Sequence, residues 1–312
     1  MTLVSETARR RLRSSRPERA PWEEPEGPLA RIGKGLALTA IVLVILGPLY
    51  VVLLTSLSSQ ETITEAGGLV MVPDGLTLDA YRAVLGGGVI TRSVLVSTGV
   101  TVVGTVISVG LSILCAYGLS RPGSFMHRPL LFTVLLTFLF GPGMIPTYLV
   151  VSGLGLVDSY WALILPSAIA AFNVVVLRSF FMSIPQELID SARIDGAGEF
   201  RILASIVLPL SRAVTAVVAL FYGVGYWNAF FNALLYIDDT RMWPLQLVLR
   251  TFVLDARDLP AGAGGIQQAV DSAPSLALRM AVVMIAVIPI LLVYPFVQRH
   301  FTKGVIIGAV KG

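Results

Sequence analysis

The chain has 312 residues, of which 55% are hydrophobic and only 13% are charged, and its mean hydropathy is +0.81. A soluble domain carries about 25% charged residues, so this composition excludes a water-soluble core of this size and favours insertion into a membrane. The single cysteine, Cys115, excludes an internal disulfide, and its apolar surroundings predict a small buried hydrophobic residue. The net charge of +4 is small, so the position of the charges along the chain is more informative than their sum.

The N-terminal segment, residues 1–34, is a basic tail with eight Lys and Arg residues. Residues 1 to about 30 are rich in Arg, Pro and Glu, a composition that predicts disorder. The tail does not fit a cleaved signal peptide, because the basic region and the apolar run after it are both too long and no small-x-small site follows. We therefore expect the first apolar run to be an uncleaved membrane anchor.

Six runs without Asp, Glu, Lys or Arg approach or exceed the roughly 20 residues that a membrane-spanning helix needs. They are Leu36–Leu57, Ser93–Leu119, Pro129–Val157, Ser159–Leu177, Ala213–Ile237 and Met280–Gln298. Because only Asp158 separates the third run from the fourth, the turn between them must be tight. The third run contains Gly141-Pro142-Gly143 and Pro146, which interrupt helical hydrogen bonding, so we expect either a hinge or a passive packing kink there.

Positive charge is distributed unevenly between the connections. Seventeen of the 23 Lys and Arg residues lie in the N-terminal tail, between runs 2 and 3, between runs 4 and 5, and after run 6. Lys and Arg collect on the cytoplasmic side of a membrane, so the sequence predicts an all-α integral membrane protein with six transmembrane helices and both termini in the cytoplasm. We expect a tail at 1–34, a transmembrane domain at 35–300 and a cytoplasmic C-terminal tail at 301–312.

The segment 183–209 between the fourth and fifth runs is cytoplasmic in this topology and amphipathic. Pro185 can begin a helix, Gly196 provides a break after Asp195, and a second helix is predicted from about Ala197. The apolar positions are Leu188, Ala192 and Ile194 in the first helix and Phe200, Leu203, Ile206 and Val207 in the second. Two such helices either lie on lipid headgroups or dock into the groove of a cytosolic partner.

The chain lacks the motifs of an independent energy source or of catalysis. The nearest approach to a phosphate-binding loop, Gly27–Gly35, fails in its spacing and in its last residue. Acidic and basic residues inside spans, which favour proton or ion coupling, are absent from all six runs. His127 and His300 have no metal-binding cluster around them, so no catalytic residue, cofactor or metal site is predicted.

The run from Asp190 to Pro209 resembles the EAA loop of ABC importer permeases, whose pattern is EAA, two residues, DGA and an apolar helix closing in I-x-L-P. The matching residues are Ala192, Asp195, Gly196, Ala197, Ile206, Leu208 and Pro209. Asp190 replaces the usual Glu, Ser191 replaces the first Ala, and Ala213 stands where the family often has a closing Pro. The resemblance implies that the loop docks an ATPase through Asp190, Ala192, Asp195, Gly196, Ala197, Glu199, Phe200, Leu208 and Pro209.

Further segments resemble the sugar-transporting branch of this family. They are Gly225-Tyr226-Trp227-Asn228, Met242-Trp243-Pro244-Leu245-Gln246, and Tyr294-Pro295-Phe296 through Lys311-Gly312. From about Leu36 onward the chain is similar to the smaller maltose permease subunit and to permeases for oligosaccharides and polysaccharide fragments. In the maltose relative the C-terminal tail reaches the ATPases, and Val310, Lys311 and Gly312 resemble that tail.

The resemblance implies a half-transporter of the bacterial cytoplasmic membrane that moves oligosaccharides or related sugars inward by alternating access. Its implied partners are a second homologous permease, two cytosolic ABC ATPase subunits, an extracytoplasmic sugar-binding protein and the lipid membrane, without nucleic acid. The ATPases, and not this chain, would hydrolyse ATP. The alternatives are an ABC permease for a non-sugar solute and an ATP-independent channel or secondary carrier.

A sugar path needs hydrogen bonds and stacking faces, and polar and aromatic residues inside the spans are the candidates. Asn173 lies near the middle of the fourth run. In the fifth run Asn228 and Asn232 share one predicted helix face, and Tyr222 and Tyr226 share a neighbouring one. For each of them the alternative is hydrogen bonding between helices.

Overall fold

The computed structural model describes residues 27–121, 123–253 and 276–309. Within these ranges the regular secondary structure is helical, and the one extended pairing is an isolated bridge between Ser58 and Leu76. The predicted all-helical class is therefore confirmed for the described part of the chain. Residues 1–26 of the basic tail and the C-terminal residues 310–312 lie outside it.

The chain divides into two compact units, residues 1–50 and 51–312, and α2 (Pro28–Ser56) begins in the first and ends in the second. The helix has 29 residues, or about 44 Å at 1.5 Å per residue, which exceeds the roughly 30 Å hydrocarbon core of a bilayer. No residue in its most apolar stretch is buried. An apolar surface of this kind requires lipid or another protein around it, so α2 has the properties of the first predicted span.

The segment 58–92 connects the first two apolar runs. The structure has two short helices in it, α3 (Gln60–Glu65) and α4 (Asp79–Leu85). Ile63 and Val70 are buried and form a small hydrophobic cluster together with Ala277 of α17 (Leu276–Ala309). This segment is therefore packed around apolar side chains in spite of its six Gly residues.

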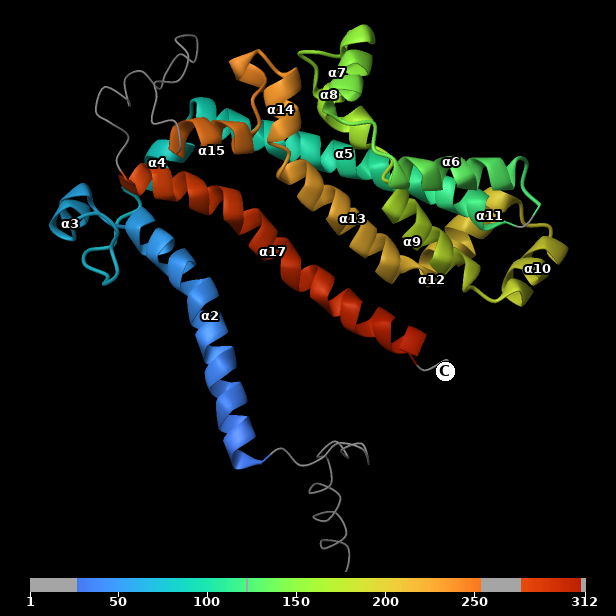
Figure 1. The fold of residues 1–312 in the computed structure, drawn as a ribbon, viewed down its shortest axis with the longest axis horizontal. Coiled ribbons are helices and arrows are strands. Elements are labelled where there is room, and N and C mark those ends of the chain that lie inside the picture. Colours follow the sequence, from blue (N-terminus) through green and yellow to red (C-terminus); the bar gives the residue numbers. More distant parts are fainter. Residues whose placement is uncertain (1–26, 122, 254–275, 310–312) are drawn as a thin grey trace, which may run out of the picture. The chain divides into compact units, whose positions relative to one another are not determined.

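The core of the second unit is built on the long helix α5 (Val89–Ser120). As Figure 1 shows, α5 packs along α13 (Arg212–Trp227) and α9 (Ala171–Met182), and α17 (Leu276–Ala309) packs on α13. Buried apolar residues of this core include Val100, Leu163, Val174, Leu177 and Val218. The free thiol of Cys115 is half-buried on α5. Helices that are apolar on most of their surface pack in this way when lipid covers the outside.

Three further candidate spans are pairs of helices that bend sharply at a short break. α6 (His127–Leu139) and α7 (Met144–Gly153) are bent by 119° across Gly141-Pro142-Gly143, where the helix break was predicted, and Gly143 has a φ of +80°. α8 (Tyr160–Ile164), with its following turn, and α9 are bent by 50°. The described residues thus contain three helices long enough to cross a membrane, and up to six spans if each bent pair is one.

Asp158 forms the tight turn predicted between the third and fourth runs. Its φ of +57° is left-handed, a conformation that Asp adopts more readily than most residues. The Oδ1 atom of Asp158 accepts the backbone N–H groups of Asp238 at 2.6 Å and Asp239 at 3.0 Å. The N–H group of Asp158 donates to the carbonyl of Tyr236 at 2.8 Å. This turn therefore holds the segment that follows the fifth run.

The fifth run, predicted as one span from Ala213 to Ile237, is not one continuous helix. α13 ends at Trp227, because Asn228 leaves the helical path as its C-cap. The indole N–H of the buried Trp227 donates to the carbonyl of Ala286 on α17 at 2.9 Å, which anchors this end. The elements that follow are α14 (Phe231–Tyr236), η3 (Thr240–Met242) and α15 (Leu245–Val253).

Candidate functional site

The predicted docking loop begins with α10 (Gln186–Ile194) and a glycine turn. Gly196 has a φ of +79°. The N–H groups of Gly196 and Ala197 donate to the carbonyls of Arg193 at 3.0 Å and Ala192 at 2.9 Å. These two bonds are the Schellman pattern of helix ends, in which a left-handed position favours glycine. The turn after Asp195 is therefore an intrinsic property of this short sequence.

The second helix of the loop begins at Glu199, two residues later than predicted. It consists of α11 (Glu199–Ile202), the π-helical stretch η2 (Leu203–Val207) and α12 (Leu208–Leu210). Its axis and that of α13 are bent by 86°. Residues 199–210 therefore do not continue the direction of α13.

The apolar side chains of the loop divide between the protein core and its surface. Ile189 is 1% exposed, and Ile202, Leu203 and Val207 are also buried. Ile194 and Phe200, by contrast, are 87% and 82% exposed. The sequence pattern included Leu188 and Ile194 in the apolar face of the first helix and omitted Ile189, which is the residue that the core buries. Two large apolar side chains therefore remain on the surface.

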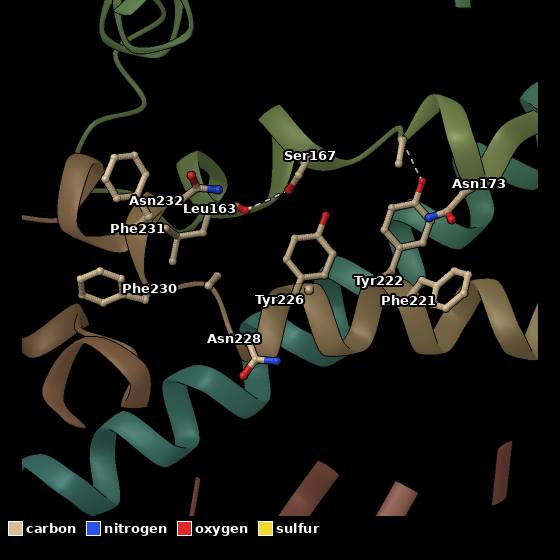
Figure 2. A pocket seen from close by; sticks show the side chains of 13 residues that line it. Leu163, Ser167, Asn173, Phe221, Tyr222, Tyr226, Asn228, Phe230, Phe231 and Asn232 are labelled. Carbon is tan, nitrogen blue, oxygen red and sulfur yellow. Dashed lines mark hydrogen bonds between the residues drawn. The ribbon is translucent and has the colours of Figure 1, made fainter. Parts of the chain in front are cut away.

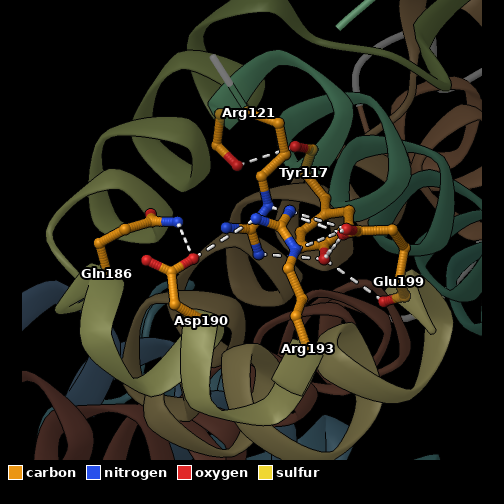
Figure 3. Close-up of polar contacts among 7 residues, drawn as sticks. Tyr117, Arg121, Gln186, Asp190, Arg193 and Glu199 are labelled. Carbon is orange, nitrogen blue, oxygen red and sulfur yellow. Dashed lines mark hydrogen bonds and ion pairs between the residues drawn. The ribbon is translucent and has the colours of Figure 1, made fainter. Parts of the chain in front are cut away.

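A network of charged and polar side chains joins this loop to the end of α5 (Figure 3). The Oε2 atom of Glu199 accepts the Tyr117 hydroxyl at 2.5 Å. Its Oε1 atom accepts Nη2 of Arg193 at 2.8 Å and Nε at 3.2 Å. Arg121 donates from Nη2 to the Tyr117 hydroxyl at 3.0 Å, and its guanidinium carbon lies 4.5 Å from the centre of the Tyr117 ring. One carboxylate thus contacts both α5 and α10.

The charges of this network stabilise one another. The pKa of the Glu199 carboxyl is lowered, first by the hydrogen bond from Tyr117 and then by the one from Arg193. The pKa of Arg193 is raised, mainly by its hydrogen bond to Glu199. Asp190 lies 3.6 Å from Nη1 of Arg193, and its Oδ1 atom accepts the side-chain amide of Gln186 at 3.1 Å. Both shifts in pKa favour the charged forms of Glu199 and Arg193.

The structure places all nine predicted docking residues on this loop, but it presents them differently. The exposed ones are Asp190, Asp195, Gly196, Glu199 and Phe200. The half-buried ones are Ala192, Ala197, Leu208 and Pro209. The second predicted ATPase contact, Val310, Lys311 and Gly312, lies outside the described residues.

All five predicted path residues line one cavity of about 350 Å³. They are Asn173, Tyr222, Tyr226, Asn228 and Asn232, which Figure 2 shows around the same space. The other lining residues come from α8, η1 (Leu165–Ser167), the N-cap of α9, α13, α14 and the segment between α13 and α14, and no charged side chain is among them. The cavity therefore offers amide groups and aromatic surfaces to an occupant.

The two tyrosine hydroxyls are engaged in bonds between helices. Tyr222 pairs with the Ser112 hydroxyl at 2.7 Å and accepts the N–H of Ala170 at 2.8 Å. Tyr226 pairs with the Ser108 hydroxyl at 2.7 Å and donates to the carbonyl of Ile164 at 3.1 Å. Hydrogen bonding between segments, the alternative that the sequence left open, is thus the role of the two tyrosine hydroxyls. The rings are stacked, with centres 6.5 Å apart, and both line the cavity.

The asparagines reach the cavity from different elements. Asn173 is buried on α9, Asn228 is the C-cap of α13, and Asn232 lies on α14. Asn228 and Asn232 do not share one helix face as predicted, because the chain turns between them. The side-chain amide of Gln246 donates to Oδ1 of Asn228 at 3.4 Å. The break after α13 is therefore what brings both amides to this space.

Sequence reasoning missed the phenylalanines of the cavity. Phe221, Phe230 and Phe231 line it, and the guanidinium of Arg250 lies 4.8 Å from the centre of the Phe230 ring. An aromatic residue in an apolar run carries no signal that separates a lining position from a packing position. Within the described residues no group of three or more His, Cys, Asp or Glu side chains could hold a metal ion.

The long apolar helices are those of a membrane protein, and the comparison with known families shows which class it belongs to. The profile of the family described as "binding-protein-dependent transport system inner membrane component" matches residues 108–307. The chain belongs to this family. It is therefore a multi-pass inner-membrane permease component of an ABC importer, as the loop pattern predicted.

Individual relatives are similar over most of their length. The polygalacturonan/rhamnogalacturonan transport system permease protein YtcP of Bacillus subtilis (strain 168) is 44% identical over 281 residues, covering 89% of this chain and 96% of the relative. Protein LplC of the same organism is 49% identical over 241 residues, covering 77% and 81%. A solved structure, a bacterial ABC transporter involved in the import of the acidic polysaccharide alginate, has a TM-score of 0.80 and 28% identity over 90% of this chain and all of that one.

Proposed function

We propose that this chain is one of two permease subunits of an importer for oligosaccharides, which moves its solute inward by alternating access. The observation that carries the proposal is the uncharged cavity, where three asparagine amides and stacked aromatic rings meet. The relatives named for polygalacturonan and rhamnogalacturonan and for alginate support a carbohydrate. The alternative cargo is a non-sugar solute, and the alternative energetics are those of a channel or secondary carrier.

The cavity suits a sugar for a chemical reason. Its volume of about 350 Å³ lies within the usual range of small-molecule sites. Each asparagine provides two donors and an acceptor, whereas the tyrosine hydroxyls are already bonded to Ser108 and Ser112. We therefore assign solute hydrogen bonds to Asn173, Asn228 and Asn232, and stacking to the ring faces.

The energy comes, in this proposal, from separate ATPases that bind the loop 183–209. Ile194 and Phe200 are large, apolar and almost fully exposed beside the Gly196 turn, and exposed apolar side chains of this kind are typical of a protein interface. The excess of Lys and Arg in this and the other connections of the same side supports a cytoplasmic loop and cytoplasmic termini. The family's dependence on binding proteins supports an extracytoplasmic solute-binding partner.

We assign the exposed apolar surface of α2 to contact with a second permease. The most apolar stretch of α2 has no buried residue, so a neighbouring membrane protein or lipid must cover it. The tail at 1–34 and the segment 301–312 would lie on the ATPase side.

The docking proposal is tested by purifying the tagged chain from native membranes in mild detergent. We expect recovery of a second permease and of a protein with ATP-hydrolysing activity. Phe200→Asp should lose the ATPase while the chain still inserts into the membrane, because a charge replaces an apolar contact. Arg201→Ala, a change at the neighbouring exposed residue, is the control. A wild-type complex without any ATPase would contradict the proposal and favour a channel or secondary carrier.

The cargo is tested separately with the complex in proteoliposomes together with its binding protein. Uptake of oligogalacturonides, neutral oligosaccharides and glycerol phosphate is compared at equal concentration. We expect ATP-dependent uptake of one of the oligosaccharides. Uptake of glycerol phosphate alone would assign a non-sugar solute.

A further inference from the structure

The docking loop is attached to the rest of the molecule by hydrogen bonds at one position, between Tyr117 and Glu199. The hydroxyl of Tyr117 donates to Oε2 of Glu199 at 2.5 Å and also lies 3.3 Å from the Glu199 carbonyl oxygen. These residues are 82 positions apart in the sequence. Tyr117 is buried at the end of α5, whereas the Glu199 side chain is 51% exposed. The contact therefore joins an internal helix to a surface loop.

The same carboxylate also holds the first helix of the loop. Arg193 binds Oε1 of Glu199 through two nitrogens, at 2.8 and 3.2 Å. Charge-assisted bonds from one guanidinium through two nitrogens are strong and fix orientation. Glu199 consequently holds α10, α11 and α5 together, on both sides of the Gly196 turn.

Arg121 stabilises the buried side of this contact. Its side chain is 14% exposed, and its Nε atom is buried, lacks a hydrogen-bond partner and lies 4.0 Å from Oε2 of Glu199. The guanidinium lies over the Tyr117 ring and donates to the Tyr117 hydroxyl. A cation in this position favours the ionised carboxylate and orients the phenol toward it.

The other end of this connection reaches the cavity. Tyr117 and Ser112 are five residues apart on the continuous helix α5, a rise of about 8 Å. Ser112 pairs with Tyr222, and Ser108 pairs with Tyr226, both on the cavity wall. Arg178 of α9 also holds this end of α5, since its Nε atom donates to the carbonyl of Leu119 at 2.7 Å. Hydrogen bonds thus attach α5 to the loop at its C-terminal end and to the cavity wall at Ser108 and Ser112.

We propose that Tyr117, Glu199 and Arg193 form a latch that makes the docking loop and α5 move as one rigid body. This inference rests on the proposed docking of an ATPase to the loop. Tyr117 and Glu199 are then positioning residues: they touch neither solute nor ATP, and they transmit the displacement of the loop to the two tyrosines of the cavity. Without the latch the loop keeps its apolar contacts through Ile202 and Val207, and it still binds the ATPase.

The test measures rigidity in the complete complex without need of the solute. In a Cys115→Ser background, spin labels are attached at Leu114→Cys on α5 and Arg201→Cys on α11, both at exposed positions. Pulsed electron paramagnetic resonance gives the distance between them, without nucleotide and after trapping with ATP and vanadate. We expect the distance to stay within about 2 Å between the two states, because a rigid body moves as a whole. In Tyr117→Phe we expect a shift or broadening of more than about 2 Å.

Matched variants separate the latch from its alternatives. Glu199→Gln should change the distance at least as much as Tyr117→Phe, because it also weakens the contact with Arg193. Adding Tyr117→Phe to Glu199→Gln should have no further effect, since the Tyr117–Glu199 contact is already weakened. Tyr148→Phe, the same chemical change on α7, should resemble the wild type. Tyr117→Phe, which alters no predicted docking residue, should retain the ATPase but transport about fivefold less oligogalacturonide per ATP hydrolysed.

Several outcomes would overturn the latch. They are unchanged distances in Tyr117→Phe, additive effects in the double variant, and loss of the ATPase from Tyr117→Phe, which would make these residues part of assembly. A wild-type complex that lacks an ATPase would instead contradict the proposed function, so the two failures are distinguishable.

Discussion

At the scale of single residues, Gly104 sets the distance between α5 and α13. A Cβ atom at this position would lie 2.9 Å from Cε2 of the buried Tyr226 ring. The Tyr226 hydroxyl is held by hydrogen bonds to Ser108 and Ile164, so the ring has little freedom to move. We expect Gly104→Ala to destabilise the protein by about 1–3 kcal/mol, because the helices must separate or the ring must leave its site. The measurement is the thermal unfolding midpoint in detergent.

Gly110 provides the control on the same helix. A Cβ atom there has nothing within 4 Å. Gly110→Ala should therefore leave the midpoint unchanged or raise it slightly, since alanine is the better helix former by about 1 kcal/mol. Equal effects of the two substitutions would contradict the close approach.

Gly196 is a second position at which the backbone restricts which residue fits, here through its conformation. At a φ of +79° a side chain with a branched Cβ is strained, whereas asparagine tolerates this region. We expect Gly196→Val to displace the turn and reduce ATP-driven transport, and Gly196→Asn to retain most of it. Pull-down of the ATPase and uptake assays measure both effects. Normal transport by Gly196→Val, or by Gly196→Pro or Asp195→Arg, would contradict a docking role for this turn.

At the scale of elements, the cavity wall combines residues that hold helices together with residues that are free to meet a solute. Tyr222→Phe removes bonds to Ser112 and to the N–H of Ala170, so it should lower the unfolding midpoint with little effect on solute affinity. Asn232→Ala should raise the half-saturating solute concentration about tenfold with an unchanged midpoint. Uptake kinetics and thermal unfolding together check this division, and a reversed pattern would refute it.

At the scale of the whole molecule, the orientation in the membrane is a prediction of charge alone. Single cysteines at Arg241 and at Ile194, in a Cys115→Ser background, lie on opposite sides in the predicted topology. A membrane-impermeant maleimide added to intact cells should label the first and leave the second unlabelled until the membrane is opened. Labelling of Ile194→Cys in intact cells would contradict the predicted topology.

Helix content and the class of protein followed from local properties of the sequence. Apolar runs near 20 residues predicted α2, α5 and α17, because a backbone in lipid must bond to itself. The turn at Gly196 was predictable as well, since its hydrogen bonds close within six residues. The family pattern in the same loop then identified the class.

Features that depend on distant contacts were not predictable. The fifth run reads as one span from Ala213 to Ile237, but α13 stops at Trp227, where the indole binds α17. The apolar pattern of α10 did not identify Ile189 as the buried residue, because only the packing of the loop on the core selects one face. Hydrophobic periodicity does not contain such information.

The sequence by itself determined that this chain is a helical membrane permease and which segment carries the family's loop pattern, because run length, charge bias and a short motif are local in the chain. Only the tertiary structure decided that five path residues share one cavity and that the hydroxyls of Tyr222 and Tyr226 are already bonded to α5. It also decided that Glu199 meets Tyr117 across 82 residues. The physical reason is that hydrogen bonds between helices depend on how the helices pack, and packing is a property of the whole fold.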